Sequence, residues 1–132
     1  MADLQDALRD RIVGDDAIAA LMGDRAYWST VPQGASLPYL RMQTISDPRP
    51  QHMKAYHKPR TIRVQIDVFS SRYAEARQIS EAIIALVAKP ATVDGVRFGR
   101  TRATGPRDLG EDTPNGFIHR LSMDLLAEHT II

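Results

Sequence analysis

A strand pattern followed directly by a helix pattern, in residues 60–89, is the feature that most constrains how this chain folds. In the first part, β-branched residues alternate with polar ones, which is typical of a strand with one buried face. The apolar positions are Ile62, Val64, Ile66 and Val68, and the polar positions are Arg63, Gln65 and Asp67. A strand with one apolar face requires more sheet and a covering layer to form a core.

After Ser70 and Ser71 the apolar period changes to that of an amphipathic helix, with Ile79, Ile83 and Val87 in one row. Either serine is suited to cap the start of this helix, and Pro90 is suited to follow its end. The helix therefore directly follows the strand and is expected to pack on the sheet.

The remaining periodic segments complete an α+β fold. A helix is predicted over residues 3–13, and a shorter one begins after Asp15 or Asp16 and stops at Gly23. Three further strands are predicted over residues 39–46, 96–104 and 117–128, whereas residues 27–38 are predicted to be an irregular connection. We therefore expect one domain over residues 1–132, with a four-stranded mixed or antiparallel sheet. Its elements follow the order α-α-β-β-α-β-β, and the long helix over residues 72–89 packs on one face beside two short N-terminal helices.

Two long polar segments, residues 47–59 and 105–116, are predicted to be loops. Loops of this length are uncommon in compact domains and usually functional. The first is basic: residues 47–60 carry Arg49, Lys54, Lys58 and Arg60 against Asp47. It is therefore the one segment with a charge excess suited to phosphate or to an acidic protein surface.

Composition and motifs argue against an enzyme. The chain has no cysteine, its formal net charge is +1, and its histidines lie at spacings that do not fit a metal site on a helix. It contains no glycine-rich phosphate loop and no nucleophile elbow. We therefore predict no catalytic residue, no metal and no cofactor. We also predict no membrane segment, because no apolar run approaches about 20 residues, and no secretory signal, because the N-terminus is acidic.

Several segments, in order along the chain, resemble the tail-completion or tail-terminator family of long-tailed bacteriophages, prophages and gene-transfer-agent-like particles. They are residues 31–40 (VPQGASLPYL) with Gln43, Ile45 and Ser46, residues 64–69 (VQIDVF), residues 73–77 (YAEAR) and residues 119–125 (HRLSMDL). These segments are structural and carry no catalytic signature, so the resemblance rests on their shared order.

The resemblance implies a structural protein that assembles with itself into a ring, usually a hexamer, at the head-proximal end of the tail tube. There it would end tube polymerisation and dock the tail to the head connector. Its partners would be the major tail tube protein and the head-tail connector or stopper, and DNA would pass through the channel without specific binding. It would be found in the tail of a virion or phage-like particle, assembled in the bacterial cytoplasm.

The long loops are the predicted sites of partner contact. The candidate residues are Arg49, His52, Lys54, His57, Lys58 and Arg60 in the first and Arg107, Asp108, Glu111 and Asp112 in the second. Two alternatives stay open: a nucleic-acid-binding module that uses the basic loop 47–60, which would require affinity that falls steeply with salt, and a small enzyme, which the missing catalytic constellation disfavours.

Overall fold

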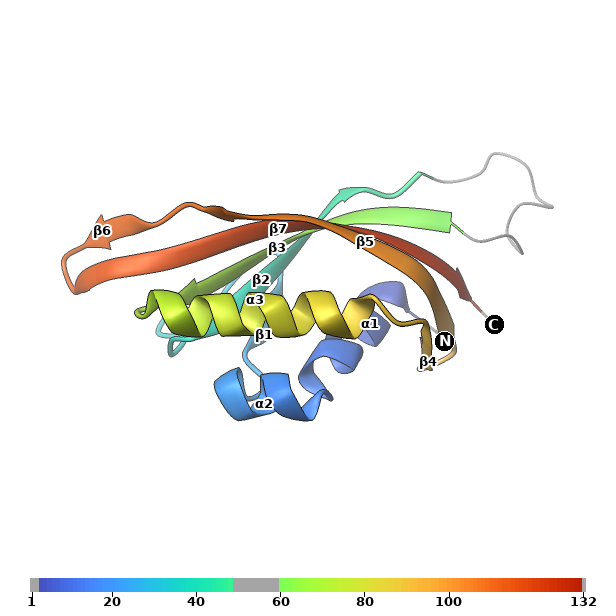
Figure 1. Ribbon diagram of the computed structural model, residues 1–132, viewed down its shortest axis with the longest axis horizontal. Coiled ribbons are helices and arrows are strands. Elements are labelled where there is room, and N and C mark those ends of the chain that lie inside the picture. Colours follow the sequence, from blue (N-terminus) through green and yellow to red (C-terminus); the bar gives the residue numbers. More distant parts are fainter. Residues whose placement is uncertain (1–2, 49–59, 132) are drawn as a thin grey trace.

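Three helices lie on the same side of a curled sheet in the computed structural model, which describes residues 3–48 and 60–131 (Figure 1). The helices are α1 (Leu4–Val13), α2 (Asp16–Met22) and α3 (Tyr73–Val87). The strands are β1 (Ala26–Trp28), β2 (Tyr39–Ser46), β3 (Arg60–Ser70), β4 (Ala91–Val93), β5 (Val96–Asp108), β6 (Glu111–Thr113) and β7 (Gly116–Ile131). Their order across the sheet is β1-β2-β3-β7-β5-β4, and β6 pairs with β7.

The α+β class is confirmed, but the prediction of four strands is wrong because the described residues form seven. The additional strands β1, β4 and β6 have three residues each, which is too short for a hydrophobic period to show. β1 overlaps the start of the segment predicted to be irregular and pairs in parallel with β2, whereas the other pairings are antiparallel. The sheet is therefore mixed.

The helix boundaries largely follow the capping residues in the sequence. The Asp3 carboxylate accepts hydrogen bonds from the first turn of α1, and the Asp15 carboxylate accepts one from the Ile18 amide of α2. For α3 the predicted serine cap is wrong: Arg72 occupies the cap position without a side-chain hydrogen bond. Ser70 instead orders the approach to α3, since its hydroxyl accepts from the Arg72 amide and donates to Glu75.

The core lies between the helices and the face of the sheet that they cover. The four β-branched residues of β3 named above are fully buried there, as are Leu40 and Met42 of β2 and Met123 and Leu125 of β7. The predicted α3 row of Ile79, Ile83 and Val87 packs against them. Burial of this apolar surface orients the sheet, and no helix of the described residues covers its other side.

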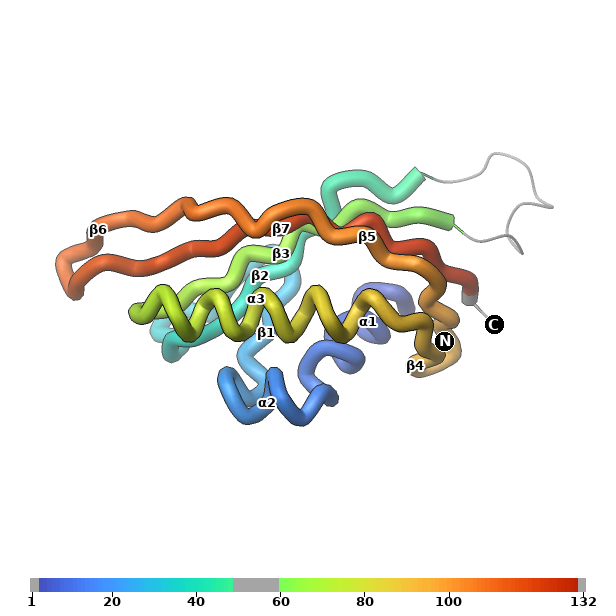
Figure 2. The backbone as a smooth tube through the Cα atoms, in the orientation of Figure 1, coloured from blue at the N-terminus to red at the C-terminus, as the bar shows by residue number. Residues whose placement is uncertain are grey.

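The end of β5, all of β6 and the start of β7 extend beyond the first turn of α3 as a two-stranded projection (Figure 2). We call residues 107–119 the arm. The prediction of a loop over residues 105–116 is wrong for most of its length, because β5 continues through Asp108 and β6 pairs with β7. Backbone hydrogen bonding continues between the two strands, since the Leu109 amide donates to the Arg120 carbonyl.

Candidate functional site

The predicted contact residues that the structure describes lie towards opposite ends of β7. Arg60 begins β3 opposite His129, near the end of β7, whereas Glu111 and Asp112 pair with Ile118 and Phe117 at its start. His129 and Ile118 are eleven residues apart on β7, so the two ends of this strand are separated by about 35 Å. Arg49, His52, Lys54, His57 and Lys58 lie outside the described residues, so their role stays a prediction. The candidate surface that the structure does show is the arm.

Exposed apolar side chains gather at the arm and its base. The exposed large hydrophobic residues of the described chain are Ile45, Tyr73, Leu109 and Phe117, and the last three, 41–45% exposed, lie on the arm or at the adjoining start of α3. The His119 ring lies 4.8 Å from that of Phe117 and 5.7 Å from that of Tyr73. His119 is therefore half-buried at the base of the arm, outside the core, and helps to fix the arm against α3.

The arm also carries unpaired negative charge. Asp108, Glu111 and Asp112 are exposed, and no ion pair to any of them occurs within residues 3–48 and 60–131. An exposed apolar cluster beside unpaired charge is typical of a surface that contacts another molecule.

The uncovered side of the sheet, which we call the open face, is rich in arginine. Alternate residues of β2, β3, β5 and β7 point to it, among them Arg41, Arg63, Arg102 and Arg120. Near its centre lies Asp67, a polar strand residue that is nevertheless fully buried. The alternation in the sequence predicted the correct side of the strand for Asp67 but not its burial.

Asp67 is buried because two guanidinium groups and an amide close over it. Arg41 and Arg120 donate to its Oδ2 at 3.1 and 3.2 Å, and the Gln65 amide donates to both carboxylate oxygens. Burial raises the pKa of Asp67, but the neighbouring Ser122 hydroxyl and the hydrogen bonds from Arg41, Arg120 and Gln65 lower it by more, so that this pKa lies below its ordinary value. Asp67 therefore stays ionised and fixes both arginines on the open face.

An aromatic row extends this cluster towards the edge of the sheet. Both guanidinium groups lie over the Phe69 ring, at 5.9 and 5.8 Å from its centroid. Phe69 stacks on Tyr39 at 5.0 Å, and Tyr39 meets Tyr27 edge-on. The centre of the open face is therefore a rigid structure whose charges already have partners.

Further along the open face, a shallow depression of about 220 Å³ lacks such partners. It is lined by Thr61, Arg100, Arg102, Leu126 and Glu128. Both arginines are exposed, and neither has an ion pair within the described parts of the chain. The depression therefore offers two available cations beside the partly exposed Leu126.

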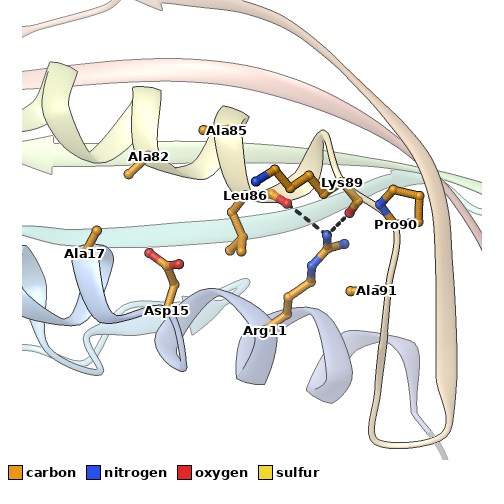
Figure 3. Close-up of a pocket in the computed structure, with 9 residues that line it drawn as sticks. All are labelled: Arg11, Asp15, Ala17, Ala82, Ala85, Leu86, Lys89, Pro90 and Ala91. Carbon is orange, nitrogen blue, oxygen red and sulfur yellow. Dashed lines mark hydrogen bonds between the residues drawn. The ribbon is translucent and has the colours of Figure 1, made fainter.

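A larger pocket of about 510 Å³ lies between α1, α2 and α3, with Arg11 and Lys89 at one end (Figure 3). Arg11 is buried and donates to the Leu86 and Lys89 carbonyls at the end of α3, with its guanidinium 5.2 Å from the centroid of Phe98. Burial lowers the pKa of Arg11. Arg11 therefore caps the C-terminal end of α3 in a pocket that lies between packed helices.

The described residues contain no group of three or more His, Asp or Glu side chains placed to hold a metal ion. Within the same residues, no helix is long and apolar enough to cross a membrane.

The comparison with family models decides the identity of the chain, because residues 6–127 match the model of the tail completion protein gp17. This chain belongs to the tail completion protein family. The resemblance seen in the sequence is confirmed. As a tail completion protein, the chain is a structural component of a phage tail-like particle and not an enzyme.

Solved structures of other proteins share this fold. A chain from the virion of a native gene transfer agent particle is similar, with a TM-score of 0.64 and 18% sequence identity over 96% of this chain and 93% of that chain. A second structure, recorded without a descriptive name, gives a TM-score of 0.55 and 15% identity over 99% of both chains. At these identities the likeness concerns the fold alone. The comparison with curated proteins found no match.

Proposed function

We propose that this tail completion protein forms a closed ring of six subunits at the head-proximal end of the tail tube. The ring ends tube polymerisation and docks the tail to the head connector. The observation that carries the proposal is the family match over residues 6–127. The likeness in fold to a chain of a gene transfer agent virion supports a place in a tail-like particle of a virus, prophage or gene transfer agent.

The shape of the subunit supports assembly through unlike surfaces. The arm extends from one end of the sheet, and within the described residues the outer edge of β5 has no partner strand from Gly99 to Asp108. Contact between two different surfaces of identical subunits produces a ring when the rotation closes. A ring also leaves its two rims free for different partners, here the major tail tube protein and the connector.

In this proposal DNA passes through the ring without specific binding. The net charge of +1 supports this, and at the centre of the open face Arg41 and Arg120 are already paired with Asp67. A channel that binds phosphate tightly would hold the DNA, with a retention that falls steeply with salt.

Native mass spectrometry of the purified protein, alone and with its tail tube protein, tests the ring. We expect hexamers, at least in the mixture, since a partner that binds the assembled ring stabilises it. Electron microscopy should show the rings at one end of tubes of limited length. Monomers in both samples, or tubes that keep growing in its presence, would contradict the proposal.

A further inference from the structure

We propose that the arm of one subunit docks on the open face of the next subunit, with its carboxylates opposite Arg100 and Arg102. This inference rests on the proposed ring and names the surfaces that close it. The occupant of the depression is thus a second copy of this chain.

The net charges of the two surfaces are opposite: the arm carries Asp108, Glu111 and Asp112 against Arg107, and the depression carries Arg100 and Arg102 against Glu128. Asp108, Glu111 and Asp112 on the arm have no ion pair within the described residues, and neither do the two arginines of the depression. The exposed Phe117 and Leu109 of the arm supply apolar surface, and Leu126 supplies it in the depression. Complementary charge sets the register of such a contact, and buried apolar area stabilises it.

A subunit cannot fill its own depression. Glu111 lies beside Ile118 of β7, whereas the depression lies at Leu126, eight residues further along the same strand or about 26 Å away. The arm points away from that site and is continuous with the paired strands β5 and β7 (Figure 1). The partner of the depression must therefore come from another molecule.

A symmetric contact between two arms is disfavoured, because it would bring the same carboxylates of both copies together. Docking of arm on depression joins two different surfaces and leaves one of each free after every contact. This is the head-to-tail arrangement that closes into a ring.

Charge reversal on each side tests the contact. The arm variant is Glu111→Lys with Asp112→Lys, and the depression variant is Arg100→Glu with Arg102→Glu. Each alone should lose the ring, with a subunit affinity reduced at least tenfold. An equal mixture of the two should regain it, because every arm then meets a depression of opposite charge in an alternating ring of even number.

The matched control is Asp6→Lys with Asp10→Lys, which changes the net charge as the arm variant does at two exposed carboxylates of α1. It should assemble like the wild type, and the arm and depression variants should melt like the wild type. Assembly by either reversed variant alone, or no recovery in the mixture, would overturn the proposal while the hexamer of the wild type still supports the ring. A wild type that stays monomeric with its tube protein would overturn both.

Cross-linking tests the same contact in the unreversed protein, because the natural chain has no cysteine. A protein with Asp112→Cys and Arg102→Cys, treated with a short bis-maleimide, should give a ladder of covalent oligomers up to the full ring, whereas each single-cysteine protein should give no product beyond a dimer. Absence of the ladder from assembled rings would overturn the proposal. A depression variant that still forms the ring but no longer binds duplex DNA would also overturn the proposal. In that case these arginines would bind nucleic acid and not the arm.

Discussion

At the scale of single residues, Asp67 shows how one buried charge organises a surface. Its carboxylate holds Arg41 from β2 and Arg120 from β7, which are 26 and 53 residues away in the chain. Both guanidinium groups cover Phe69 and are fixed in place. Guanidinium groups held in this way have limited freedom to bind DNA or a protein partner. Arg100 and Arg102, near the end of the sheet that carries β4, have no ion pair within the described residues and keep that freedom.

Replacement of Asp67 by asparagine should lower the free energy of unfolding by about 2 kcal/mol, because two guanidinium groups lose their shared anion. The pKa of Asp67 is lower in the folded than in the unfolded protein. Its contribution is therefore present above the unfolded carboxyl pKa of about 4 and is lost as the pH falls through the lower folded value. Urea denaturation at about five pH values, from about 2.5 to about 7, measures how the free energy of unfolding depends on pH. An asparagine variant with the stability and acid sensitivity of the wild type would contradict this role.

At the scale of elements, the bulge before the arm determines where the arm points. The pairing of β5 with β7 shifts register between Thr104 and Arg107. Gly105 lies in this bulge with a φ of 106°, and a Cβ there would lie 2.9 Å from the Ser122 carbonyl oxygen. Glycine is therefore favoured at this position for two reasons: the backbone has a positive φ, and the two strands approach each other closely.

Gly105→Ala should destabilise the fold more than Gly116→Ala. Both glycines have φ above 100°, but a Cβ at Gly116 would have no atom within 4 Å. The second variant thus carries the backbone strain of about 1–3 kcal/mol alone, and the first adds the clash. Thermal melts of the two proteins measure the difference. Equal melting temperatures would mean that β5 moves freely away from Ser122 at this point.

The elements that the sequence predicted correctly are those whose pattern lies within one segment. The alternation in β3 and the row on α3 are local, and the aspartates that cap α1 and α2 lie directly before them. β6 is a strand because β7 pairs with it, and no period in three residues indicates this. Gly105 and Pro106 were interpreted as a loop, although they accommodate a bulge within one strand. The burial of Asp67 and the depression at Arg100 and Arg102 arise from distant segments and were not predicted.

At the scale of the whole molecule, the two ends of the sheet differ in charge. The arm carries three exposed carboxylates against one exposed arginine, Arg107, and the depression towards the other end carries two exposed arginines against one carboxylate, Glu128. Opposite charge at the two ends favours head-to-tail association and disfavours the symmetric dimer. In the proposed ring, this distribution would favour head-to-tail contact between subunits before any partner binds.

Assembly of the purified protein should weaken as salt is raised from about 0.05 to 0.5 M, because exposed charges are screened over shorter distances at high salt. Phe117→Ser should weaken assembly by a similar factor at every salt concentration, since it removes apolar contact alone. Sedimentation velocity across the salt series measures both effects. Assembly that strengthens with salt would show that apolar contacts dominate.

The central position of β7 has a mechanical consequence. This 16-residue strand runs the length of the sheet and is hydrogen-bonded to β3 on one side and to β5 and β6 on the other. Bonds between antiparallel strands lie across the strand direction. A pull on the arm along β7 therefore loads many of these bonds in shear together, and they resist as a set. A force applied to the arm in this direction would therefore be shared among many hydrogen bonds of the sheet.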